Sequence, residues 1–316
     1  MNTHRIHIID ILRGFALIGI LFANIPGIAG MYANANVTAI DIQIYRFIGF
    51  AFEQRFFPIF SFLFGLGFFI FMQNAEAKGT PAYQLIIRRL LLLILFGLIH
   101  QFLQPGEALL IYGIFGFGLL PLYKHSPKIV FLAAIAMLVF GIITTDYFVT
   151  LAMFYLGMFI GKIGYFENPE KYRRQVQTIW AFSLLAIGPS LWAQQHYMPT
   201  NHFFTWQSIA GLFIAAFLAT SILLWRQSEN YLKFLAAYGR TALTNYILQS
   251  VIVWLIALAL GGRGTVSYQA VPWIWLCVFP VQIIISNVWM RRFNYGPLEW
   301  LWRWGTYGRK PLFVKA

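Results

Sequence analysis

The sequence is poor in charge, in cysteine and in alternating polarity, and each shortage excludes a class of protein. Only 10% of the 316 residues are charged, whereas a soluble domain carries about a quarter. The apolar runs are continuous and do not alternate with period two, which excludes a membrane β-barrel. The single cysteine, Cys277, permits neither an internal disulfide nor a cysteine metal site, and no HExxH-type spacing offers another metal site.

The rest of the composition is typical of a membrane protein. Hydrophobic residues make up 59% of it and the mean hydropathy is +0.68. We predict an all-α polytopic membrane protein, a bundle of about ten transmembrane helices that forms a single domain over residues 1–290. The expected spans are residues 9–30, 47–72, 86–104, 107–123, 128–145, 147–165, 176–194, 206–225, 238–260 and 270–290.

The basic residues predict the orientation. With the N-terminus inside and alternating spans, 20 of the 23 Lys and Arg lie on the inner side, and only Arg46, Arg55 and Arg263 lie outside. This bias predicts a multi-pass protein of the cell membrane with both termini cytoplasmic. The net charge of +13 therefore reflects cytoplasmic segments, and we expect the bilayer rather than nucleic acid as partner.

The tail after the last span, residues 291–316, is basic and rich in tryptophan. Pro297 can begin a short helix at its first position. Trp300, Trp302 and Trp304 suit the headgroup region, so we interpret the tail as a cytoplasmic interfacial anchor.

Ionisable and amide side chains within spans form a cytoplasmic set. Asp10 and Arg13 are three residues apart on one helix face, where they form a structural pair or offer Arg13 to a phosphate-bearing ligand. Arg240, Asn245 and Gln249 share part of one face of the ninth span. This stripe predicts either helix–helix hydrogen bonds or a path for a polar ligand that enters from the cytoplasm.

A second set lies toward the outer face. Asn24 can hydrogen-bond a neighbouring helix, while Glu53 and Arg55 form a structural pair or line a polar cavity close to a kink predicted at Pro58. His100 ends the third span and Glu107 follows a Pro-Gly turn. A histidine and a carboxylate on adjacent helix ends can act as a base and the group that orients it, although the same histidine can be an ordinary interfacial residue.

Glycines predict where helices pack closely. Gly157 and Gly161 have GxxxG spacing, and Gly65 belongs to a similar set, so each predicts a close helix contact. No Walker-type phosphate loop is present.

Six motifs in order resemble the YeiB-like bacterial membrane proteins, a family described by domain of unknown function 418. They run over nearly the whole chain and read IDILRGFALIGILFAN, FFPIFSFLFGLGF, RRLLLLILFGLIHQFL, GEALLIYGIFGFGLLPL, YGRTALTNYILQS and GPLEWLWRWGTYGR. This family is more distantly similar to transmembrane acyltransferases such as heparan-α-glucosaminide N-acetyltransferase. Where the family commonly shows Gly-Asp after the third span, this chain keeps a carboxylate in Gly106-Glu107.

The resemblance implies that an acyl group, such as acetyl, passes from cytoplasmic acyl-coenzyme A to an acceptor hydroxyl or amine outside. The acceptor is a glycan, a lipid or a small molecule, and the protein acts alone or as a homo-oligomer. The heparan enzyme uses a histidine in the outward region after its first span, but this chain has none between His7 and His100. His100 is therefore our candidate base.

The hypothesis assigns catalytic roles to His100, Glu107 and Asn24. It assigns substrate binding to Arg13, Asp10, Glu53, Arg55, Arg240, Asn245 and Gln249. Two other readings of the same residues stay open: a transporter or exporter of a small molecule or lipid-linked substrate, and a packing subunit or sensor without turnover.

Overall fold

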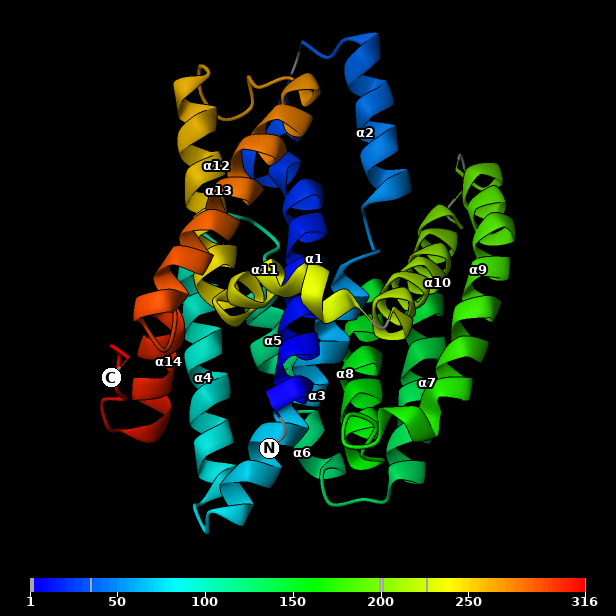
Figure 1. The fold of residues 1–316 in the computed structure, drawn as a ribbon. Helices are drawn as coiled ribbons and strands as arrows, with labels where there is room; N and C mark the ends of the chain where they lie inside the picture. The colour runs from blue at the N-terminus through cyan, green and yellow to red at the C-terminus, as the bar shows by residue number, and fades with distance from the viewer. Residues whose placement is uncertain (1–2, 35, 199, 201, 226, 316) are drawn as a thin grey trace.

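The computed structural model describes residues 3–34, 36–198, 200, 202–225 and 227–315, and these residues form a bundle of helices (Figure 1). Within them there is no β-strand, only an isolated bridge between Phe293 and Val314. The helices are α1 Thr3–Ala29, α2 Ala39–Ala51, α3 Phe57–Ala77, α4 Ala82–His100, α5 Ala108–Gly116, α6 Leu119–Leu122, α7 Pro127–Ile143, α8 Asp146–Lys162, α9 Arg173–His196, α10 Phe203–Leu224, α11 Ser228–Arg240, α12 Ala242–Ala259, α13 Val271–Arg292 and α14 Pro297–Tyr307.

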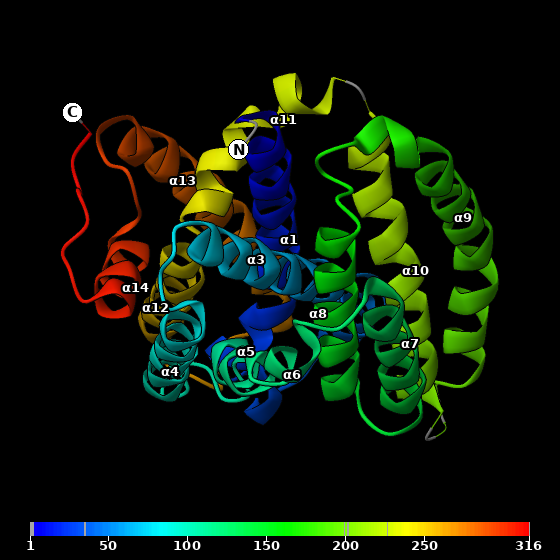
Figure 2. The same ribbon diagram turned by 90° about the horizontal axis from the view of Figure 1, so that it is seen from below.

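Two groups of helices flank a central pair. Helices α1 and α3 lie in the middle, with α7, α8, α9 and α10 on one side and α4, α12, α13 and α14 on the other (Figures 1 and 2). Helix α1 packs against α3, α11, α12 and α13. The first helix of the chain therefore joins the C-terminal helices to the rest of the bundle.

Seven described helices are long and apolar enough to cross a membrane. They are α1, α3, α4, α9, α10, α12 and α13, and α7 is a shorter apolar helix. A helical membrane protein is thereby confirmed, whereas the number of ten spans and the cytoplasmic location of both termini stay predictions.

The predicted second span, residues 47–72, is wrong as a single kinked helix. Helix α2 ends at Ala51 and α3 begins at Phe57, so Pro58 stands in the first turn of α3. Proline is tolerated there because the first backbone N–H groups of a helix have no partner within it. The predicted span 107–123 is likewise divided, into α5 and α6.

Helix α2 is attached through Asp41 to the segment that precedes α13. Its carboxylate accepts hydrogen bonds from Thr38, Ser267 and Gln269, and with Thr38 it forms a capping box at the start of α2. Burial alone would raise the pKa of Asp41, but these hydrogen bonds outweigh it and lower the pKa to about 2.

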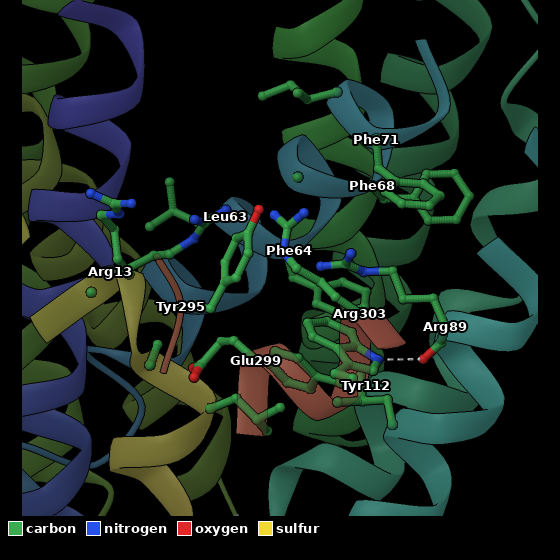
Figure 3. A pocket seen from close by; sticks show the side chains of 18 of the residues that line it. Arg13, Leu63, Phe64, Phe68, Phe71, Arg89, Tyr112, Tyr295, Glu299 and Arg303 are labelled. Atoms are coloured by element: carbon green, nitrogen blue, oxygen red, sulfur yellow. Dashed lines mark hydrogen bonds between the residues drawn. The ribbon is translucent and has the colours of Figure 1, made fainter. Parts of the chain in front are cut away.

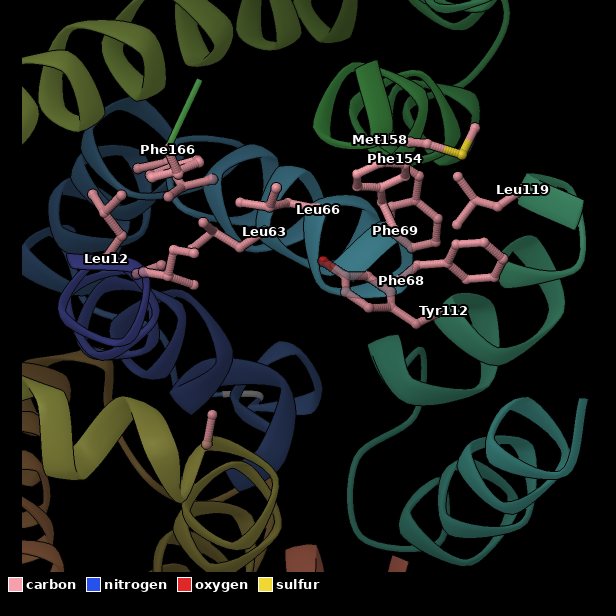
Figure 4. Close-up of a cluster of buried hydrophobic side chains, with 14 of the residues drawn as sticks. Leu12, Leu63, Leu66, Phe68, Phe69, Tyr112, Leu119, Phe154, Met158 and Phe166 are labelled. Carbon is pink, nitrogen blue, oxygen red and sulfur yellow. The ribbon is translucent and has the colours of Figure 1, made fainter. Parts of the chain in front are cut away.

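The hydrophobic core lies along α3 and includes Leu63 and Leu66 of α3 with Phe154 and Met158 of α8 (Figure 4). At Gly65 a β-carbon would stand 1.9 Å from the carbonyl oxygen of Phe154, and at Gly157 another would stand 1.9 Å from that of Phe62. Both glycines allow the backbones of α3 and α8 to touch. The predicted close helix contact is confirmed at these positions.

Candidate functional site

A cavity of about 910 Å³ lies between α1, α3, α4, α5, α12 and α14 (Figure 3). Its lining runs from His7 to Ile20 along α1 and from Phe57 to Lys78 along α3. At 1.5 Å per residue these stretches measure about 20 Å and about 30 Å. The cavity is thus elongated, and it follows nearly the whole of α3.

Polarity changes along the cavity. One end, at the last turn of α3 and beside the N-terminal turns of α1, is lined by His7, Lys78, Arg309 and Lys310. The other end, at the first turns of α3 and α5, is lined by aromatic and aliphatic residues that include Phe60, Leu109, Tyr112 and Tyr246. The arrangement suits a ligand with an anionic head and an apolar tail.

Basic side chains outnumber acidic side chains in the lining of this cavity. The acidic residues among its described lining are Asp10 and Glu299. The basic ones are Arg13, Lys78, Arg89, Arg240, Arg303, Arg309 and Lys310, with His7 beside them. The excess of positive charge favours an anionic ligand.

Both acidic groups are engaged by the protein. Asp10 accepts a hydrogen bond from Arg13 at 3.0 Å, so the pair predicted from the spacing is present and it also lines the cavity. Glu299 of α14 accepts from the backbone N–H of Thr244 at 3.1 Å and from its hydroxyl at 2.6 Å. Burial raises the pKa of Glu299 while these bonds oppose the rise.

The position of Arg13 and Arg240 follows from two glycines where α1 crosses α11. A β-carbon on Gly239 would stand 1.9 Å from the carbonyl oxygen of Asp10, and one on Gly14 would stand 2.4 Å from that of Leu235. Only glycine permits this approach. The crossing brings the end of α11, with Arg240, against the turn of α1 that carries the ion pair.

His100 and Glu107 meet beyond the apolar end of the cavity. His100 Nδ1 lies 3.2 Å from a carboxylate oxygen of Glu107, and both side chains are fully buried. Glu107 also caps α5, because its two oxygens accept from the N–H groups of Leu109 and Leu110 at 2.7 and 2.6 Å. The pair is therefore held rigidly at the start of a helix.

This contact favours one tautomer of the histidine. Both oxygens of Glu107 already accept backbone N–H groups, so the hydrogen bond to His100 is best made with the proton on Nδ1, which leaves Nε2 as the free ring nitrogen. That Nε2 is buried and has no hydrogen-bond partner among the described residues. His100 packs edge-on against the ring of Tyr246, with 5.0 Å between centroids, and Tyr246 lines the cavity. His100 therefore lies behind one aromatic side chain, outside the described lining.

Glu53 and Arg55 form a separate cluster at the break between α2 and α3. Arg55 is fully buried and donates to the backbone carbonyls of Phe50 and Glu53 and to the side chain of Gln194, at 2.6–2.7 Å. Glu53 accepts from Gln207. These contacts connect the break to α9 and α10, and neither residue lines the cavity described above.

The predicted stripe of Arg240, Asn245 and Gln249 is divided by the structure. Arg240 ends α11, whereas Asn245 and Gln249 belong to α12, because Thr241 at the junction leaves the helical conformation. The Asn245 amide donates to the hydroxyls of Thr241 and Ser286. Gln249 and Asn24 are different, since the Nδ2 of Asn24 and both amide atoms of Gln249 are buried without a partner in the described chain.

Sequence reasoning missed the contribution of α14. Helix α14 begins at Pro297 as predicted, but it packs against α4 and α12 and supplies Glu299, Trp302 and Arg303 to the cavity. A detectable signal was the spacing of Glu299 and Arg303, four residues apart on one face. From the sequence alone, Arg89, which lines the same cavity, was only one of the 20 inner Lys and Arg.

Comparisons with known proteins identify the family of this chain. The family model described as "Protein of unknown function (DUF418)" matches residues 160–309. No solved structure matches the chain.

Three bacterial proteins are similar over almost their whole length. The "Uncharacterized 39.9 kDa protein in amylase 3'region" of Bacillus acidopullulyticus is 35% identical, over 98% of this chain and 96% of its own. YxaH of Bacillus subtilis is 29% identical, over 97% and 95%, and YeiB of Escherichia coli is 26% identical, over 93% and 94%. The chain therefore belongs to the YeiB-like family that the DUF418 model describes.

Proposed function

We propose that this protein is a transmembrane acyltransferase that moves an acyl group from acyl-coenzyme A to a hydroxyl or amine acceptor. The donor enters from the face that carries Lys78 and Arg309, which the distribution of Lys and Arg makes cytoplasmic. The acceptor, a glycan, lipid or small molecule, approaches from the opposite side. The observation that supports this most is a single cavity that is basic at one end and apolar beside the His100–Glu107 pair at the other.

The donor fits the gradient of the cavity. Phosphates of coenzyme A carry negative charge and suit the basic end, whereas the pantetheine arm and the acyl group suit the lining near Tyr112 and Tyr246. The thioester would then lie on one side of the Tyr246 ring and His100 on the other. A rotation of Tyr246 is therefore part of the proposed cycle.

The transfer itself needs a base and an oxyanion donor. Nε2 of His100 takes the proton from the acceptor, whose oxygen or nitrogen attacks the thioester carbonyl. Collapse of the tetrahedral intermediate breaks the carbon–sulfur bond, and the leaving thiolate takes the proton from His100. We assign the oxyanion to Nδ2 of Asn24, a buried donor with no partner within the described residues, which lies one helical turn beyond Ile20, the last residue of α1 in the cavity lining.

The test is binding and slow hydrolysis of acetyl-coenzyme A by the purified protein in detergent. Arg13→Ala should weaken binding, and His100→Ala should lower hydrolysis about 10²–10⁴-fold while binding persists. Two substitutions outside the cavity serve as matched controls: Arg173→Ala, at a surface ion pair in which Arg173 is half-buried, and His202→Ala, at the exposed start of α10. Both controls should behave as wild type.

Two results would contradict the proposal. If well-folded protein binds neither acetyl- nor longer acyl-coenzyme A, the donor is wrong and transport becomes the better reading. If His100→Ala hydrolyses the thioester at the wild-type rate, the base is wrong.

A further inference from the structure

Two arginines that line the cavity, Arg89 and Arg303, are stacked on aromatic rings. Arg89 of α4 lies with its guanidinium 3.7 Å from the ring centroid of Trp302 and 5.0 Å from that of Phe71. Arg303 of α14 lies 4.4 Å from the ring centroid of Tyr295. Figure 3 shows Arg89, Arg303 and Tyr295 around the cavity. Trp302 donates a hydrogen bond to the backbone oxygen of Arg89 at 2.9 Å.

Stacking fixes the faces of these guanidinium groups and leaves their edges available. Each edge presents N–H donors in a planar fork. Among the described residues neither Arg89 nor Arg303 donates a side-chain hydrogen bond or forms an ion pair. The two acidic groups of the cavity do not neutralise them, because Asp10 pairs with Arg13 and Glu299 binds Thr244.

Like charges in a cavity repel one another unless an anion lies between them. The charges of Arg13 and Arg303 both act on Arg89, and the same cavity also contains Lys78. A single carboxylate would occupy one fork. Two linked phosphates present enough oxygens for two forks, and their charge suits the excess of positive side chains.

We propose that Arg89 and Arg303 form a clamp for a diphosphate, and that α14 is the element that recognises the head of the ligand. The identification of this ligand as acyl-coenzyme A rests on the proposed function, whereas the clamp requires only a diphosphate attached to a tail that fits the apolar end. An isoprenoid diphosphate has the same chemistry, and the experiment separates the two sources.

The experiment titrates full-length protein in detergent with coenzyme A, inorganic diphosphate and farnesyl diphosphate, followed by calorimetry. Arg89→Gln and Arg303→Gln should each weaken coenzyme A and inorganic diphosphate about 10–100-fold, because each removes charge-assisted hydrogen bonds. The matched control is Arg88→Gln, an exposed arginine next to Arg89 on the same helix, which should bind as wild type. Arg303→Lys keeps the charge without the fork and should lose part of the affinity.

Melting temperatures show which variants remain folded. If a glutamine variant does not fold, Arg303→Lys still tests the clamp. Wild-type affinity for coenzyme A and for diphosphate in folded variants of both arginines would overturn the clamp and leave the acyltransferase intact. Binding of farnesyl diphosphate and inorganic diphosphate, lost in the variants, with no binding of coenzyme A, would support the clamp and refute the acyl donor.

Discussion

The crossing of α1 and α11 gives the sharpest structural prediction, which concerns Gly239→Ala. The new β-carbon would stand 1.9 Å from the carbonyl oxygen of Asp10, and both atoms belong to helix backbones or are fixed to them. To reach an ordinary contact of about 3.4 Å, α11 must move away from α1 by about 1.5 Å. Overpacking of this kind costs about 1–3 kcal/mol.

That displacement has two readouts. For a chain of 316 residues the cost corresponds to a melting temperature lower by roughly 2–5 °C. Because the same crossing sets the distance between Arg13 and Arg240, ligand affinity should fall as well. A matched control is Gly27→Ala on α1, whose β-carbon meets only the Tyr32 ring at 3.7 Å and should leave both quantities unchanged.

The assay is thermal unfolding in detergent, followed by tryptophan fluorescence, for wild type and both variants. If Gly239→Ala melts together with wild type and Gly27→Ala, the backbones of α1 and α11 are not in contact, and our account of how Arg240 reaches the cavity fails.

Three further predictions address the site and its supports. Glu107→Gln should lower acyl transfer about 10²–10⁴-fold, because an amide that donates to Nδ1 of His100 moves the proton to Nε2; an unchanged rate would exclude a role for this pair. Because the pKa of Asp41 is lowered, its ionised carboxylate stabilises the fold fully above the ordinary pKa of 3.8, and this stabilisation is lost as the pH falls through about 2. Hydrogen exchange in α2 should therefore increase between these two pH values in wild type, and the Asp41→Asn variant should not show this increase. Glu299→Ala should free α14 from α12 and expose it to protease, and equal cleavage of wild type would refute this attachment.

Several features could be predicted from the sequence because they depend on residues that are close together in the chain. Apolar runs longer than a bilayer indicate membrane helices wherever they pack. The three-residue spacing of Asp10 and Arg13 places them on one helix face, and Gly65 and Gly157 indicate close packing because no other residue lets backbones touch.

Other features depend on contacts between distant segments and could not be predicted in the same way. Hydropathy does not show that the chain breaks between α2 and α3, since the residues on both sides are equally apolar. It also does not show that Arg55 binds the backbone carbonyls at this break. It does not show that Thr241 separates Arg240 from Asn245. The tryptophans of the tail have the composition of an interfacial anchor, and only the packing of α14 on α4 shows that one of them, Trp302, lines the cavity.

The order in which the cavity wall is made has a consequence for biosynthesis. The lining joins His7, near the start of α1, to Pro311, which follows every helix of the bundle. While the ribosome is still making α13, Arg89 lacks Trp302 above its guanidinium, and the cavity has no wall on that side. The cavity is therefore complete only after the last helices have been inserted and α14 has docked, so a chain that stalls before residue 297 enters the membrane with the cavity open on that side.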